Sequence, residues 1–375
     1  MTYIEDDEAL RRAARQWPGE ALLAVDTEAA GYHRYRDTIC LVQTSTRTDT
    51  FVIDALAVSS LAPLEPVLAD PAVEILLHDA DYDLRLLERD HGLRVTNLFD
   101  TKIAAQLCGE PAIGLAYLVE KYLGVLLDKK HQRADWARRP LPPELLDYAA
   151  EDTRHLPALR DALCARLHEL GRWSWAAEEF RLLETAPRVM PSDDSDAFRR
   201  LKNTSDLVPR QMAALRELYE WRESAAEERD VAPFRVILND ALVAIARAMP
   251  KTLGALTALR EVPPRISERH GEAMFRAVQR ARRLAESQLP ERQMRRRRPP
   301  PDPELDRRVE RLKAARDVAA DRLGLDRGFL MPRQQLEQIA RLRPLSIDEL
   351  RAAPDMRNWQ AEAIGAELLS VLAAS

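Results

Sequence analysis

The sequence predicts an α/β domain over residues 1–200, followed by two small all-α domains over residues 201–290 and 291–375. In the first part of the chain, short apolar, β-branched runs alternate with helical patterns, which is typical of layered α/β folds. In the later parts, apolar residues recur only at helical spacing. Proline-rich stretches at 185–196 and 290–304 separate the three parts. A length of 375 residues fits two to three domains.

Each element of the α/β domain follows from its local pattern. Apolar runs rich in β-branched residues and bounded by glycine, arginine or aspartate predict five strands. These strands are residues 21–29, 38–46, 49–56, 73–80 and 95–101. Helical spacing of apolar residues predicts helices at 58–69, at 81–92 and from 101 to 107. The second of these helices ends at a glycine, which is a common stop signal.

The rest of the chain is predicted to be helical. A Pro-Pro pair starts a helix at Pro143, and we expect Pro157 to divide it, because proline lacks the backbone N–H that a helix needs. Residues 208–288 and 304–373 then share one order: a long amphipathic helix, a proline-led helix, a short helix after a turn, and a closing helix. This shared order predicts a duplicated module, with one copy in each all-α domain.

Composition excludes several classes of protein. Hydrophobic residues make up 46% and charged residues 31%, so the chain can bury cores and is not a disordered tail. No run approaches the roughly 20 apolar residues of a membrane span, and no leader pattern opens the chain. The 3 cysteines are far apart and predict neither disulfides nor a zinc site. We therefore expect a cytoplasmic protein with no membrane partner, and the absence of a glycine-rich phosphate loop predicts no nucleotide cofactor.

Charge is distributed unevenly along the chain. The net charge of −5 divides into −11 for residues 1–200 and +3 for each of the two rear parts. Such a difference in charge between parts of one chain indicates that the parts have different roles.

Two acids end the first long strand. Asp26 and Glu28 are two residues apart in the segment VDTEA, and such residues share one face of a strand. Like charges at this distance are tolerated when a divalent cation lies between them. The alternative is a solvated strand end, because D-x-E patterns are common by chance.

Further candidates lie on two predicted helices. Tyr148 and Asp152 are four residues apart and therefore share a helix face. Taken alone, this pattern is better explained by an ordinary packed tyrosine and a solvated acid. Asp83 lies in the first turn of the 81–92 helix, where an acid also simply favours the helix dipole. Four carboxylates at three element ends, with a tyrosine nearby, fit hydrolysis of phosphodiesters by two metal ions about 3.5–4 Å apart.

These residues carry a resemblance to a known family. The series V-D-T-E-A, then H-x-x-x-x-D-L up to Leu84, then Y-A-A-x-D up to Asp152, resembles the three exonuclease motifs of the DEDD superfamily in its tyrosine branch. Three further segments resemble the ribonuclease D family: 99–109, 115–129 and 135–156. The two rear modules resemble HRDC domains, the first more closely than the second.

The resemblance implies a ribonuclease-H-like α/β fold and a 3′→5′ exoribonuclease. It also explains the charge division, because the basic rear modules would hold the RNA while the acidic front domain binds metal ions. We expect the chain to work as a monomer, although the sequence leaves a ring open as the alternative. Its substrates would be the 3′ ends of precursor tRNA and other structured small RNAs, trimmed to release nucleoside 5′-monophosphates. Two divalent ions, Mg²⁺ or Mn²⁺, would be bound by four acids: Asp26, Glu28, Asp83 and Asp152. Tyr148 would orient the attacking water, and Glu28 would share in catalysis.

Other residues are candidates for substrate binding. Lys129 and Arg139 could hold phosphates, and Trp136 could stack on a base, although solvated loop charges and a packed tryptophan are the alternatives. In the modules, four basic residues are candidate RNA contacts: Arg229, Arg235, Lys251 and Arg265. Two rival functions remain open from the sequence: a DNA exonuclease of the same superfamily, and a nucleic-acid-binding scaffold without catalysis.

Overall fold

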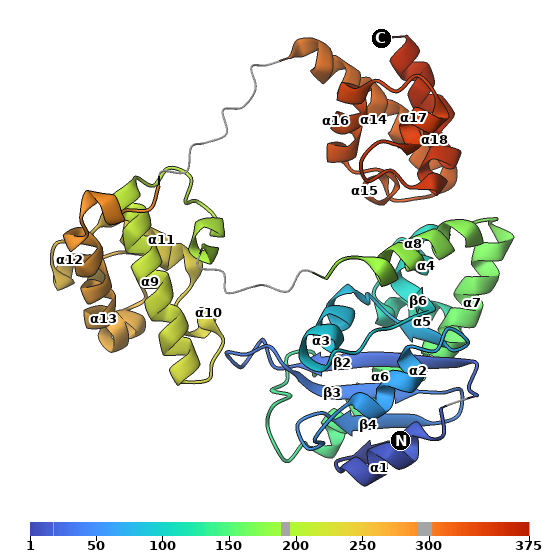
Figure 1. The fold of residues 1–375 in the computed structure, drawn as a ribbon, viewed down its shortest axis with the longest axis horizontal. Helices are drawn as coiled ribbons and strands as arrows, with labels where there is room; N and C mark the ends of the chain where they lie inside the picture. The colour runs from blue at the N-terminus through green and yellow to red at the C-terminus, as the bar shows by residue number, and fades with distance from the viewer. Residues whose placement is uncertain (18, 129, 189–195, 292–301, 375) are drawn as a thin grey trace. The chain divides into compact units, whose positions relative to one another are not determined.

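A computed structural model describes residues 1–17, 19–128, 130–188, 196–291 and 302–374. Contacts between residues divide the chain into two compact units. Figure 1 labels their helices and strands. Met1–Glu28, Ile39–Arg188 and Pro300–Ser375 make up the first unit, and Ala29–Thr38 and Val189–Pro299 make up the second. Among the described helices, none has the length and apolar character needed to cross a membrane.

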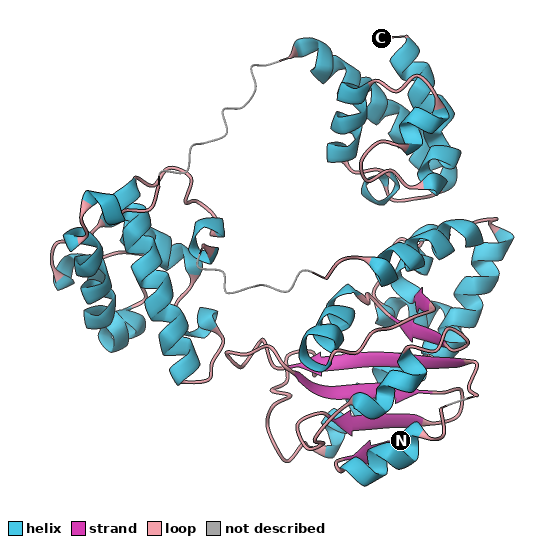
Figure 2. Ribbon diagram, in the orientation of Figure 1, coloured by secondary structure: helices cyan, strands magenta, loops and turns pink. Residues whose placement is uncertain are grey.

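A six-stranded sheet forms the centre of the first unit (Figure 2). Its strand order is β1-β4-β3-β2-β5-β6. The strands are β1 (Thr2–Ile4), β2 (Leu22–Ala29), β3 (Ile39–Ser45), β4 (Thr50–Asp54), β5 (Glu74–Leu77) and β6 (Leu98–Asp100). β4 pairs antiparallel with β3 and parallel with β1, whereas β2, β5 and β6 run parallel to one another, so the sheet is mixed.

Five of these strands confirm the sequence prediction, with shorter bounds at most ends. β3 and β4 are buried at every residue, which explains why their sequences, ICLVQTS and TFVID, carry no charge until the final aspartate. No sequence pattern predicted β1, because three residues are too short to show a period. This short strand pairs with β4 from Thr2↔Phe51 to Ile4↔Ile53.

Helices surround the sheet and extend beyond it in the first unit. They are α1 (Asp7–Ala14), η1 (Ala62–Leu64), α2 (Glu65–Leu68), α3 (Asp81–His91), α4 (Thr101–Cys108), α5 (Leu115–Leu123), α6 (Pro143–Arg154), α7 (Leu156–Glu169) and α8 (Trp173–Thr185). The expected division near Pro157 is confirmed, since α6 ends and α7 begins on either side of His155. The helix expected at 58–69 is instead the 3₁₀ turn η1 followed by the four-residue α2, with prolines in the first turn of each.

The predicted duplicated module is present. The first copy, preceded by η2 (Ala197–Arg200) and followed by η3 (Glu286–Gln288), contains α9 (Pro209–Glu228), α10 (Pro233–Val236), α11 (Asn239–Ala248), α12 (Leu253–Thr257) and α13 (Pro264–Arg283). The second copy contains α14 (Pro303–Leu323), α15 (Arg327–Leu330), α16 (Arg333–Leu342), α17 (Ile347–Arg351) and α18 (Asn358–Ala373). Each helix of the second copy begins 94 residues after its counterpart, so the numbering of the two copies can be compared directly.

Matching side chains show that the two copies are built alike. Thr252 caps α12 by accepting from a backbone N–H, and Ser346 caps α17 in the same way. The closing helix of each copy crosses the short helix at a glycine. A Cβ atom on Gly271 would lie 3.3 Å from Leu253 Cδ1, and one on Gly365 would lie 2.8 Å from a side-chain atom of α17. In both copies the glycine therefore leaves room for the two helices to cross closely.

The second copy packs against α8 within the first unit. Trp359, at the start of α18, is 1% exposed and stacks on Trp175 with ring centroids 5.2 Å apart. Its indole Nε1 donates a hydrogen bond to Glu179 at 2.7 Å. Glu178 accepts hydrogen bonds from the backbone nitrogens of Asn358 at 2.7 Å and Trp359 at 3.0 Å. A carboxylate of α8 thus caps the N-terminus of α18.

The second unit joins the first copy to the loop Ala29–Thr38, which connects β2 to β3. The backbone nitrogen of Ala232 donates to the carbonyl oxygen of His33 at 3.2 Å, and the backbone nitrogen of Tyr35 donates to Asp230 Oδ1 at 3.3 Å. A loop of the α/β fold therefore shares its contacts with the first module.

Candidate active site

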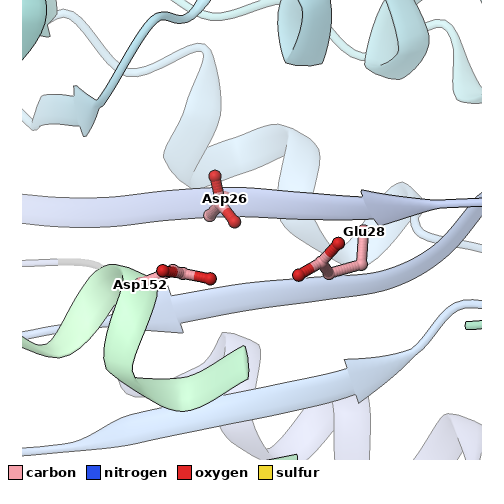
Figure 3. Close-up of side chains that lie close together, drawn as sticks. All are labelled: Asp26, Glu28 and Asp152. Carbon is pink, nitrogen blue, oxygen red and sulfur yellow. The ribbon is translucent and has the colours of Figure 1, made fainter. Parts of the chain in front are cut away.

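The strand β2 carries the first two candidate acids. Its first four residues, from Leu22 to Val25, are buried, and Asp26 and Glu28 follow on one face as the strand nears its end. Figure 3 shows both carboxylates beside Asp152, which comes from α6. The alternation predicted from the sequence therefore brings both acids toward the same helix.

The helix α6 carries the other pair of candidates. Pro143 occupies its first turn, where a missing N–H costs nothing. Ala149 and Ala150 are fully buried, and their small side chains let α6 approach β3 and β4 closely. The hydroxyl groups of Thr153 and Ser45 lie 2.8 Å apart and join the helix to β3. These contacts hold the catalytic face of α6 against the sheet.

Three of the predicted acids meet in one cluster. Each of Asp26, Glu28 and Asp152 offers a carboxylate oxygen, and these oxygens all lie within 4.8 Å of one another. Hard divalent cations such as Mg²⁺ and Mn²⁺ prefer oxygen ligands of this kind. The donor set therefore fits a divalent metal ion by both chemistry and spacing.

Asp83 approaches the cluster from α3 and is held by a hydroxyl group. Thr27 Oγ1 donates to Asp83 Oδ1 at 2.5 Å, and Asp83 is 6% exposed. Asp100 holds the turn that precedes α3. Its carboxylate accepts a hydrogen bond from the backbone nitrogen of Ala80 at 2.8 Å and also caps α4. Burial raises the pKa of Asp83 to about 6, although the Thr27 hydroxyl favours the charged form.

The negative charges of these acids repel one another and raise their pKa values. Burial raises the pKa of Asp26 well above its usual range, and the charges of Asp83 and Asp152 raise it further. The same three causes raise the pKa of Glu28. Burial also raises the pKa of Asp152 to about 7, with a further contribution from Glu151. A divalent cation would offset this repulsion, and its binding would favour release of protons from the acids.

Tyr148 lies beside the acids. Its ring packs 6.1 Å from that of Trp136 in a stacked arrangement and 5.6 Å from His131. Burial, followed by the charge of Asp152, raises the pKa of the Tyr148 phenol above its ordinary value. The phenol therefore keeps its proton at neutral pH and serves as a hydrogen-bonding group.

The three predicted substrate-binding residues differ in the contacts that the structure shows for them. Arg139 makes two hydrogen bonds of 2.6 Å to Asp54 and one of 3.2 Å to the Cys40 carbonyl, so its observed contacts hold the sheet to the loop before α6. Trp136 is 2% exposed and packs on Tyr148, as the packing alternative expected. Lys129 lies outside the described residues. A substrate role for all three stays a prediction.

Sequence reasoning missed Thr27 and Asp100. Thr27 lies between the two acids of β2, so its position in the motif was a usable signal, but its partner on another element was not visible. Asp100 ends β6 and accepts four backbone N–H groups, from residues 79, 80, 102 and 103. An aspartate directly before a helical run is a recognisable capping pattern.

Comparison with known proteins gives matches over most of the chain. A family model described as 3′-5′ exonuclease matches residues 1–168, and a model described as HRDC domain matches residues 211–278 and 306–372. Both matches follow the division into an α/β fold and a duplicated helical module.

Relatives and solved structures extend these matches. Ribonuclease D of Pseudomonas paraeruginosa is 32% identical over 375 residues, which covers 99% of this chain and 97% of the relative. Ribonuclease D of Escherichia coli is 34% identical over 297 residues, with 78% of each chain covered. The crystal structure of Escherichia coli RNase D, titled an exoribonuclease involved in structured RNA processing, superimposes with a TM-score of 0.74 at 28% identity, over 100% of this chain and 98% of that one.

Proposed function

The chain belongs to the ribonuclease D family and is a hydrolytic 3′→5′ exoribonuclease, and from this premise we propose that it trims the 3′ ends of precursor tRNA and other structured small RNAs. The observation that supports this most is the cluster of Asp26, Glu28 and Asp152, because it supplies the ligands that metal-dependent phosphodiester hydrolysis requires. The related Escherichia coli enzyme is described as acting on structured RNA, which supports the choice of substrate.

The DEDD superfamily is metal-dependent, and we propose that two ions, Mg²⁺ or Mn²⁺, are held by four acids: Asp26, Glu28, Asp83 and Asp152. When bound, such ions lower the pKa of water and stabilise the charge that develops on the phosphate oxygens. The chain itself supplies the metal ligands. β2 presents two acids side by side, α6 presents the third, and Thr27 fixes the orientation of Asp83.

Tyr148 has a distinct part in the proposal. Its protonated phenol lies on the same face of α6 as Asp152, one helical turn earlier. The phenol oxygen accepts a hydrogen bond from the attacking water and orients it, while Glu28 positions the same water from β2. Packing against Trp136 fixes the phenol ring for this purpose.

The proposal includes the organisation and setting of the enzyme. We propose catalytic and helical domains at 1–200, 201–290 and 291–375, with the helical domains binding RNA. We also propose that the chain acts as a monomer in the cytoplasm and without a nucleotide cofactor. Lys129, Trp136 and Arg139 remain proposed contacts to the 3′ strand.

Product analysis on a 3′-extended tRNA tests this function. With divalent metal the wild-type chain should release nucleoside 5′-monophosphates, and a chelator should stop the release. Asp152→Asn should lower kcat by about 10²–10³-fold or more, because a charged ligand is lost. Asp147→Asn is the matched control, since Asp147 is exposed on the same helix, and it should retain activity. Equal rates on RNA and DNA of one sequence would instead favour a general exonuclease, and full activity of Asp152→Asn would refute the site.

A further inference from the structure

The second unit contains an exposed cluster of rings where the loop Ala29–Thr38 meets α10. Tyr32 is 45% exposed and Phe234 is 44% exposed, and their ring centroids lie 5.5 Å apart. The guanidinium of Arg235 lies over both rings, 5.1 Å from the centroid of Tyr32 and 5.7 Å from that of Phe234. We call Tyr32, Phe234 and Arg235 the ring cluster.

Hydrogen bonds hold the ring cluster in place. Arg235 donates from Nε to the carbonyl oxygen of Tyr32 at 2.9 Å, and its Nη2 lies 3.0 Å from His33 Nδ1. The imidazole of His33 also packs edge-on against Tyr32, with centroids 5.1 Å apart. The arrangement is therefore organised by polar contacts, yet nearly half of each aromatic side chain remains exposed to solvent.

Charges around the cluster favour a ligand that stacks. Arg34 lies 3.5 Å from Asp230, and Arg36 lies 3.5 Å from Glu227, so these two loop arginines face carboxylates of the first module. Because these arginines are paired with carboxylates, they attract phosphate groups less strongly. Exposed aromatic rings beside a guanidinium instead bind nucleobases, by stacking and by cation–π contact. An unpaired nucleobase is the ligand that fits.

The duplicated module provides an internal comparison. At the offset of 94 residues, Gly328 and Phe329 of the second copy occupy the places of Phe234 and Arg235. Phe329 there stacks on Trp359, with centroids 6.0 Å apart, and so takes part in the packing of that copy against α8. Among the described residues of the two copies, this position carries an exposed ring pair only in the first.

The loop also connects the cluster directly to the catalytic strand. Tyr32 follows Glu28 by four residues in the sequence. We propose that the ring cluster is a stacking subsite for an unpaired base of the RNA substrate, upstream of its 3′ end. This proposal rests on the exoribonuclease activity.

An abasic scan tests the subsite. One abasic ribonucleotide is moved stepwise from the 3′ end of a single-stranded RNA, and KM and kcat are measured with wild-type chain and with Phe234→Ala. For the wild type, KM should rise about 5- to 150-fold at one or two positions, which is the range for loss of one stacked base. For Phe234→Ala, KM on intact RNA should rise by a similar factor and the positional dependence should disappear, with kcat unchanged.

Matched variants separate stacking from simple packing. Phe234→Trp should restore the positional profile, whereas Phe234→Leu, which keeps an apolar side chain, should behave like alanine. Leu345→Ala removes an 86% exposed apolar side chain from the second copy and should leave KM unchanged. An unchanged profile in Phe234→Ala, or full restoration by leucine, would overturn the subsite. Failure of the wild type to degrade intact single-stranded RNA would instead count against the catalytic site.

Discussion

The two copies of the helical module use the same end for different contacts. In the first copy, Asp230 and Ala232 lie at this end and bond the loop Ala29–Thr38. In the second copy the same end presents Asn358 and Trp359, which bond α8. The same order of helices, repeated 94 residues later, therefore contacts two different parts of the α/β fold.

The difference comes from a few surface positions. The counterparts of Asn358 and Trp359 in the first copy are Pro264 and Arg265. Proline at the first helical position has no N–H to satisfy, so α13 begins without an outside partner. Asn358 and Trp359 do expose N–H groups, and Glu178 of α8 accepts both. Pro264 thus removes one of the two N–H groups that Glu178 accepts in the second copy, whereas Arg265 keeps the other.

The largest effect is expected from removing the indole of Trp359. Trp359→Ala should destabilise the second copy by about 3–5 kcal/mol, because a buried ring and its hydrogen bond to Glu179 are lost. Amide exchange of α14 and α18, read separately from the rest of the chain, measures the change. The counterpart variant Arg265→Ala alters an exposed residue and should change stability by less than about 0.5 kcal/mol. Equal losses in both variants would contradict the comparison.

A second effect distinguishes the two units by pH. The raised pKa values of Asp83, about 6, and Asp152, about 7, lie above the values of unfolded aspartate. Bound protons therefore stabilise the metal-free fold below the pKa of unfolded aspartate, about 4, and this stability is lost as pH rises from there to about 7. In chelator, the melting temperature of the first unit should fall between about pH 4 and pH 7, by about 2–4 °C for each kcal/mol lost. Added Mg²⁺ or Mn²⁺ should remove the fall, and a flat profile in chelator would refute the assignment.

A smaller effect is expected from the cap on α18. Glu178→Ala leaves two N–H groups of that helix without their acceptor and should cost about 1 kcal/mol, as loss of a helix cap does. Glu178→Gln keeps an acceptor oxygen and should cost less. Exchange rates of the Asn358 and Trp359 amides report the change directly. The start of α13 should be unaffected by either variant, and faster exchange there would show that the two helix starts are not independent.

Much of the site was predictable from local pattern. The period of two placed Asp26 and Glu28 on one face of a strand, and helical spacing placed Tyr148 and Asp152 together. The meeting of these elements depends on packing of α6 on β3 and β4, for which only the family resemblance gave a sign. Asp83 could not be separated from its neighbours by pattern, because Thr27, its partner, lies more than fifty residues away.

The modules show the same limit. Their helix order followed from periodicity and proline positions, and the duplication is present helix by helix. Packing of the second copy on α8 was not predicted, because it depends on Glu178 and Trp359, side chains far apart in sequence with no periodic signal between them. Periodicity reports which face of an element is apolar, but it does not report which distant element covers that face.

The acids of the cluster are divided between β2 and α6, and this division has a consequence while the protein is being synthesised. Asp26 and Glu28 leave the ribosome long before Asp152, so the ligand set is complete only when α6 has emerged and docked on the sheet. A growing chain that ends before α6 lacks a ligand, and we expect such a fragment to leave RNA intact in a nuclease assay.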